Sequence, residues 1–223
     1  MVQPEPSSLL YPSYRTLAVQ CPAPTRTLAQ PFARRPIYSR PMSELDPSPR
    51  GRVVSVNVSP GGVPKLPVAS AWVGRLGLDT DAHTEPEPTH GGPDQAVCIY
   101  AVEAIERVAA DGHQAFPGAY GENLTVRGLD WASLRAGDVL AIGEDGLTLE
   151  LTKQAGPCQT IAHWFVERGI ARISPKVHPE DARWYARVLV EGGVEPGASV
   201  ILDRASVNVG SARQARSESH TGA

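Results

Sequence analysis

Short runs of alternating apolar and polar residues, separated by turns rich in glycine and proline, make up most of the sequence between residues 52 and 204. The clearest run, 147–152, alternates with a period of two, as a half-buried strand does. Strands are predicted at 53–58, 68–73, 96–100, 124–126, 139–142, 147–152, 184–190 and 199–202. Helical spacing is found near 102–110 and 159–168. This pattern predicts a mostly β fold (α+β), a β-barrel with a few appended helices.

The ends of the chain lack this periodicity. Residues 1–50 hold ten of the 21 prolines, and we expect a disordered leader rich in proline and arginine. Met42 stands shortly before the first predicted strand and is a candidate for the true start, whereas the arginine-rich, acid-poor stretch before it also fits a transit peptide. Residues 51–204 are expected to form the folded domain, followed by a flexible tail at 205–223.

Composition excludes several classes of protein. The net charge is −3, and residues 51–204 carry thirteen lysines and arginines against twenty acidic residues, which argues against nucleic-acid binding. No apolar run reaches the roughly 18 residues of a membrane span, and no signal peptide is recognisable. Three widely spaced cysteines indicate neither a disulfide framework nor a zinc site, so we expect a protein of the reducing cytoplasm.

Cys158 is the main candidate for chemistry. It follows Gly156-Pro157, between a predicted strand and a predicted helix that Gly169 is placed to end. Unpaired N–H groups and the helix dipole at a helix start favour a thiolate, although the dipole alone lowers a thiol pKa by less than about one unit. Full activation requires a cationic neighbour or a soft metal. The alternative is that Cys158 is a small buried side chain, as free cysteines often are. Cys98, by contrast, is expected to point inward in its strand as a core residue.

Two further segments concentrate polar groups. The first runs from Asp79 to Asp94 with two histidines, which could chelate a divalent metal although the spacing matches no common site. In it His90 is either an anion-binding residue or a turn residue satisfied by Asp94. The second is the loop 117–124, where Gly118 and Gly121 permit unusual backbone geometry and can place hydrogen-bonding groups at a barrel mouth.

Taken in order, the segments 58–65, 90–95, 118–124, 134–138 and Pro157-Cys158 resemble the MOSC domain, the family named for the C-terminal domain of molybdenum cofactor sulfurases. The resemblance spans residues 52–204 and implies a MOSC-like β-barrel whose pocket takes molybdenum cofactor (molybdopterin). Cys158 matches the family cysteine that either ligates molybdenum or carries sulfur. The remaining residues assigned to cofactor binding are His90, Gly91, Asp94, Gln95, Gly121, Glu122, Asn123 and Arg183.

The resemblance is greater to small stand-alone bacterial members, some of which reduce N-hydroxylated or related N-oxygenated compounds. It therefore implies a molybdenum-dependent oxidoreductase with a small-molecule substrate and an electron-transfer partner. The alternative is a sulfur carrier in which Cys158, activated by Arg183 or Arg187, cycles through a persulfide. The sulfur would then come from a cysteine desulfurase partner, and pyridoxal phosphate would belong to that partner because none of the three lysines lies in a recognisable Schiff-base context.

Two weaker hypotheses use the same residues. A noncatalytic module that binds or stores the cofactor needs only the pocket. A hydrolase would use Cys158 as nucleophile and His90 as base, but no third group that would orient the base is recognisable.

Overall fold

The alternation in β8 (Leu147–Ala155) sets the plan of the fold. Leu147, Leu149 and Leu151 are fully buried, while the residues between them are partly exposed, as predicted. The computed structural model describes residues 50–82 and 91–204. The expectations for the leader and the tail lie outside these ranges.

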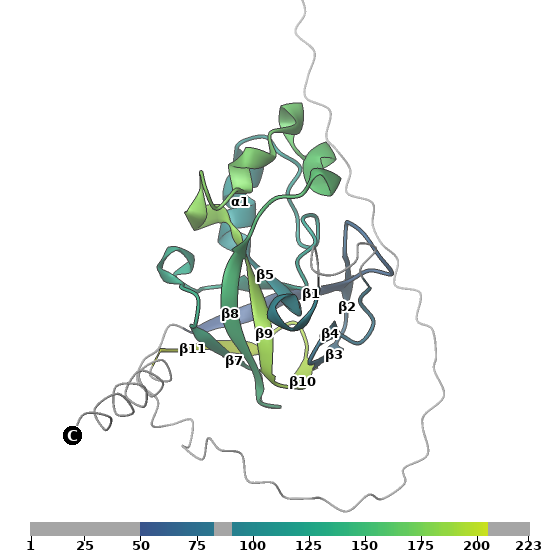
Figure 1. The fold of residues 1–223 in the computed structure, drawn as a ribbon, viewed down its shortest axis with the longest axis vertical. Coiled ribbons are helices and arrows are strands. Elements are labelled where there is room, and N and C mark those ends of the chain that lie inside the picture. Colours follow the sequence, from purple (N-terminus) through teal and green to yellow (C-terminus); the bar gives the residue numbers. More distant parts are fainter. Residues whose placement is uncertain (1–49, 83–90, 205–223) are drawn as a thin grey trace, which may run out of the picture. The chain divides into compact units, whose positions relative to one another are not determined.

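Seven strands close into a barrel in the order β11-β7-β8-β9-β5-β6-β1, and β11 pairs with β1 to complete the ring (Figure 1). Their bounds are β1 (Arg50–Val58), β5 (Val97–Ala101), β6 (Leu124–Arg127), β7 (Val139–Ile142), β8 (Leu147–Ala155), β9 (Arg183–Val190) and β11 (Ser199–Asp203). Closure removes the exposed edges that an open sheet would present. The predicted mostly β, barrel-like fold is confirmed.

Two small additions flank the barrel. Strand β2 (Leu66–Val68) pairs with β1, and β3 (Ala71–Gly74), β4 (Gly77–Leu78) and β10 (Gly192–Val194) form a second sheet. The single strand predicted at 68–73 is wrong, because Ala69 and Ser70 separate β2 from β3. Strands β4 and β10 were not predicted, since two or three residues are too few to show a period.

β5 and β6 are the one parallel pair in the barrel, so their connection must cross over rather than form a hairpin. The crossover contains α1 (Val102–Ala110), whose bounds match the predicted helix. Its buried face comprises Val102, Ala104, Ile105 and Val108, at the spacing that makes one helical stripe. The crossover also includes the loop 118–123, which leads directly into the start of β6.

The predicted helix at 159–168 is wrong. Residues 159–168 form two short 3₁₀ turns, η4 (Gln159–Trp164) and η5 (Val166–Arg168), and η6 (Ile170–Ile173) and η7 (Pro179–Asp181) follow them. Two others, η2 (Pro93–Gln95) and η3 (Trp131–Ser133), lie earlier in the chain. Glu167 and Arg168 have positive φ angles of 53° and 57°, which a continuing α-helix does not allow. The apolar residues of this segment, although they follow helical spacing in the sequence, therefore belong to separate turns and do not form one face of a single helix. None of the helices in the described ranges has the length and apolar character needed to span a bilayer.

Candidate functional site

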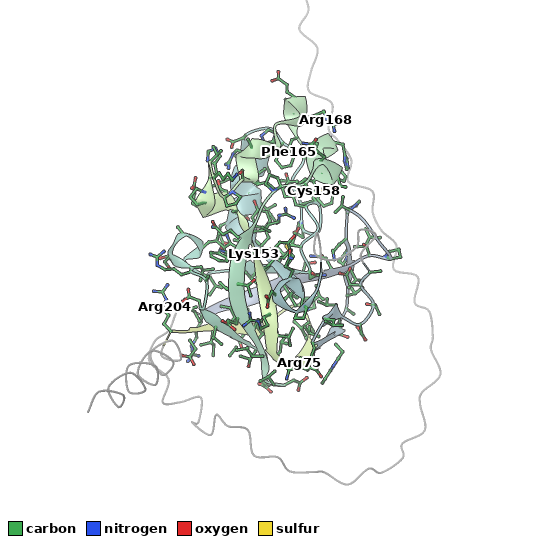
Figure 2. The ribbon with its side chains drawn as sticks, in the orientation of Figure 1. Arg75, Lys153, Cys158, Phe165, Arg168 and Arg204 are labelled. Carbon is green, nitrogen blue, oxygen red and sulfur yellow. The ribbon has the colours of Figure 1, made fainter. Side chains whose placement is uncertain are left out.

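One pocket gathers residues from six separate stretches of the chain. Its lining consists of Gly62, Val63, Lys65, Ala82, Gly91, Gln95, Cys98, Tyr120, Gly121, Asn123, Cys158, Thr160, Ile161, Arg183 and Tyr185. Figure 2 shows Cys158 at the end of the barrel that carries α1 and the 3₁₀ turns, away from Arg75 and the second sheet. The pocket thus forms where the 118–123 loop and the segment after β8 meet β5 and β9.

Cys158 begins η4 as its N-terminal cap. Its backbone is extended (φ −110°, ψ 155°), and its sulfur accepts a hydrogen bond from the Thr160 N–H at 3.4 Å. The Thr160 hydroxyl lies 2.9 Å from the same sulfur. The prediction that Cys158 stands at a helix start is confirmed, but the helix is a six-residue 3₁₀ turn. Local N–H and O–H groups therefore contact the half-buried sulfur, rather than the dipole of a long helix.

Arg183 joins the two loops that flank the pocket. Its Nη1 donates to the carbonyl oxygen of Tyr120, and its Nη2 donates to that of Gly156 at 3.0 Å. A second tie is aromatic, since the Tyr120 ring stacks on Phe165 at 4.9 Å between centroids. Among the described residues, no carboxylate lies within ion-pairing distance of the Arg183 guanidinium, and its buried Nε has no hydrogen-bond partner. A buried positive charge therefore forms part of the pocket wall.

The 118–123 loop requires glycine for close packing. Gly118 has φ +87°, and a Cβ there would lie 2.0 Å from the Lys65 carbonyl oxygen. The two segments are joined at this point by a hydrogen bond from Lys65 N to Gly118 O (2.9 Å). Gly121, also at positive φ, lines the pocket with its backbone.

Glu122, assigned to cofactor binding from the sequence, does not line the pocket. Its side chain is fully buried, and Oε1 accepts hydrogen bonds from Gly118 N (2.7 Å) and Thr125 Oγ1 (3.2 Å). Burial raises the pKa of Glu122 above its ordinary value, against the opposing effect of these hydrogen bonds and of Arg183. Glu122 therefore holds the 118–123 loop in place through hydrogen bonds and does not contact the pocket itself.

Lys65 and Asp81 form a buried ion pair at the edge of the pocket. Asp81 also accepts hydrogen bonds from Ser59 N (2.9 Å) and from Asn123 Nδ2 (2.9 Å). These contacts occupy both oxygens of Asp81, which the sequence had offered as a metal ligand in the 79–94 segment. Lys65 was missed as a site residue, although it ends the 58–65 segment on which the family resemblance partly rests.

The other residues proposed from the sequence differ in whether they line the pocket. Gly91 and Gln95 line the pocket, and His90 lies outside the described residues. Asp94 points away, since its carboxylate accepts from Arg187 Nε at 2.9 Å. Arg187 also pairs with Glu150 (3.0 Å) and does not line the pocket, so no contact supports it as the activator of Cys158.

A family model described as the MOSC domain matches residues 86–201, which is more than half of the chain. The chain belongs to the MOSC domain family. The protein YflK of Bacillus subtilis (strain 168) is 34% identical over 147 residues, which cover 63% of this chain and 62% of YflK. The protein YiiM of Escherichia coli (strain K12) is 28% identical over 148 residues, 64% of each chain. The match thus spans less than two thirds of either relative.

The solved structures agree with the MOSC assignment. The crystal structure of YiiM from Geobacillus stearothermophilus superposes with a TM-score of 0.53 at 28% identity, covering 69% of this chain and 75% of that one.

Cys98 and Tyr185 are two further pocket residues of this MOSC protein without a predicted role there. Cys98, expected in the core, is buried as predicted but lines the pocket, and its strand partner Tyr185 does so as well. Burial raises the pKa of Cys98 to about 11 and that of Tyr185 to about 12. Both side chains are therefore neutral near pH 7, and Cys98 is a protonated thiol.

Only one group of three metal-ligating side chains is found in the described part of the chain, formed by His178, Glu180 and Asp181. Asp181 is already bound by Arg107 (2.6 Å) and by Arg172 (2.5 Å), so this group is a salt-bridge cluster. Cys158 belongs to no such group of three among the described residues, although the Cys98 thiol lines the same pocket. The protein thus offers no complete set of three such ligands for a metal at Cys158 in the described ranges.

Proposed function

We propose that this MOSC protein binds molybdenum cofactor in the Cys158 pocket and uses it to reduce N-hydroxylated or N-oxygenated small molecules. The observation that carries the proposal is the placement of Cys158: a half-buried thiol in a pocket, outside any group of three metal-ligating side chains in the described ranges. Thiolate sulfur suits a soft, redox-active metal, and a metal held within a cofactor needs only one ligand from the protein.

The residues around the pocket fit such a group in two respects. The sulfur is held at the pocket by Thr160 N–H and by the extended backbone of Cys158. The buried guanidinium of Arg183 and the backbone of Gly121 offer a positive charge and close approach to an anionic part such as a phosphate. Lys65 adds less positive charge, because Asp81 neutralises it.

When bound, the cofactor would supply two-electron redox chemistry. Reduction of an N–OH group to N–H and water consumes two electrons and two protons. The neutral Cys98 thiol and the Tyr185 phenol, which both line the pocket, can donate hydrogen bonds to a polar substrate at neutral pH. The two electrons for this reduction would come from a partner protein.

The test is metal and pterin analysis of protein purified from a host that makes molybdenum cofactor. We expect about one molybdenum and one pterin per chain, together with reduction of an aromatic hydroxylamine by a chemical reductant. A fully folded protein without molybdenum or pterin would overturn the proposal. A bound cofactor with no reduction of any N-hydroxylated compound would leave a binding or storage protein.

The sulfur-carrier alternative is favoured by one observation. The Cys158 sulfur is partly exposed and contacts hydrogen-bond donors, as a thiol that exchanges sulfur with a partner should. In that case a pyridoxal-phosphate-dependent desulfurase would transfer sulfur to Cys158. Peptide mapping after incubation with such an enzyme and free cysteine would show an added sulfur atom on Cys158 in the absence of molybdenum.

A further inference from the structure

A carboxyl group and a guanidinium, those of Glu122 and Arg183, are buried beside the pocket without forming an ion pair. Glu122 is fully buried with one carboxylate oxygen, Oε2, that has no hydrogen-bond partner, and Arg183 is 5% exposed with an unpartnered Nε. They do not form an ion pair, although each affects the ionisation of the other. Natural proteins leave few buried polar atoms unsatisfied, so two of them beside one pocket indicate a role beyond folding.

The groups around this pair have fixed charge near neutral pH. Burial raises the pKa values of Tyr100 and Tyr120 above their ordinary values and that of Cys98 to about 11, so all three stay neutral. Lys65 and Asp81 face the same region, but they form an ion pair and cancel in charge. Glu122 is thus the carboxyl group in this cluster whose proton can compensate a new charge in the pocket.

Arg183 lies where such a charge would bind. It lines the pocket, and its Nη1 comes within 4.0 Å of the position that a Cβ on Gly121 would occupy. Its two Nη groups donate to carbonyl oxygens, which leave its positive charge uncompensated. An oxyanion is the ligand that matches an uncompensated, buried guanidinium.

We propose that Arg183 forms an oxyanion subsite in the pocket and that occupation of this subsite is coupled to the uptake of one proton by Glu122. The coupling follows from charge. Without a ligand, Arg183 favours the ionised form of Glu122. A bound anion cancels that effect and repels the carboxylate, so the neutral acid becomes favoured. The inference deepens the proposed function, because a cofactor phosphate or an anionic substrate group would occupy the same subsite.

The test uses the full chain without molybdenum, with sulfate as the probe because its charge does not change near neutral pH. If one proton is taken up for each sulfate bound, the dissociation constant of sulfate must rise with pH, by at most about tenfold per pH unit. Calorimetry in two buffers of different ionisation enthalpy should show proton uptake on binding, and this measurement needs no variant.

Three variants test whether Arg183 binds the sulfate and whether Glu122 takes up the proton. Glu122→Gln should bind sulfate more tightly at the upper end of the pH range and lose the proton uptake. Glu144→Gln, which alters an exposed carboxylate outside this pocket, should behave like the unmodified protein. Arg183→Gln should weaken sulfate binding by about tenfold or more.

Absence of sulfate binding would overturn the subsite. Binding with no proton uptake, or with uptake that persists in Glu122→Gln, would overturn the coupling. Neither result bears on molybdenum content, which is measured separately, so failure of this inference and failure of the proposed function are distinguishable.

Discussion

Asn123 holds both backbone groups of Cys98. The Asn123 N–H donates to the Cys98 carbonyl oxygen at 2.7 Å, and Asn123 Oδ1 accepts the Cys98 N–H at 3.1 Å. The Asn123 amide also donates to Asp81 (2.9 Å) and to the Asn57 carbonyl oxygen (3.3 Å). One side chain therefore ties the 118–123 loop to β5, β1 and the Lys65–Asp81 ion pair.

Asn123→Ala should destabilise the fold, because it leaves the buried Cys98 N–H without a partner. The expected loss is about 2 kcal/mol in the free energy of unfolding, measured by urea denaturation. Gln114→Ala, at an exposed position, is the control and should change stability by less than about 0.5 kcal/mol. Equal stability of the two variants would show that Asn123 is not needed to hold the loop.

Gly118→Ala tests the close approach between the 118–123 loop and Lys65. The added Cβ would lie 2.0 Å from the Lys65 carbonyl oxygen, so the backbone must move, and we expect a loss of more than about 3 kcal/mol. Gly137→Ala is a matched control, since Gly137 has a similar φ of +92° but open space around it. It should lose only about 1 kcal/mol, the cost of the left-handed backbone. Similar melting curves for the two variants would contradict the close packing.

The sequence predicted features that depend on near neighbours. The alternation of Leu147, Leu149 and Leu151 gave β8, and the apolar stripe of α1 gave its bounds. Closure of the barrel could not be predicted in this way, because β11 and β1 lie about 150 residues apart and periodicity carries no information about partners. The density of short strands already indicated a barrel and the family resemblance implied the same fold, but neither supplied the strand partners.

The pocket was predictable where a motif marked it and not elsewhere. Cys158 and Gly121 stand in recognisable loops, and Arg183 was also assigned to cofactor binding, but its hydrogen bonds to Tyr120 and Gly156 across the fold could not be predicted; Lys65, Cys98 and Tyr185 were not assigned to the pocket. The separate 3₁₀ turns after Cys158 were missed for a related reason: Phe165 stacks on Tyr120 and the Trp164 carbonyl oxygen accepts from Gln114 N, and such contacts with distant residues leave no local pattern.

Glu122→Gln should alter how stability depends on pH. Because the pKa of Glu122 is raised in the folded state, its protonated form contributes stability at pH values below the ordinary glutamate value of 4.5, and this contribution is lost as pH rises through the raised value. As the pH rises from 4.5 to the raised pKa of Glu122, the unmodified protein should therefore lose stability relative to Glu122→Gln, by at most about 1.4 kcal/mol per pH unit. Urea denaturation over a pH series gives the difference, and parallel curves would contradict the raised pKa.

The two cysteines of the pocket should differ in reactivity. Cys158 is partly exposed, whereas Cys98 is buried with a pKa of about 11, so iodoacetamide should label Cys158 at least about tenfold faster near pH 8. Peptide mapping by mass spectrometry separates the two sites. Labelling of Cys98 at a comparable rate would show that the pocket opens more widely than its geometry indicates.

Cys158→Ser should abolish molybdenum binding and reduction while leaving the fold intact. Serine is nearly isosteric and can keep the contact with Thr160, but its hydroxyl is scarcely ionised and is a poor ligand for a soft metal. Cys98→Ala, which removes the other thiol of the same pocket, is the control. It should lose about 1 kcal/mol of stability but retain molybdenum. Melting temperature, molybdenum content and hydroxylamine reduction are measured on both variants. A folded Cys158→Ser protein that retains metal and activity would reject Cys158 as the ligand, and an unfolded one would show that the cysteine is structural.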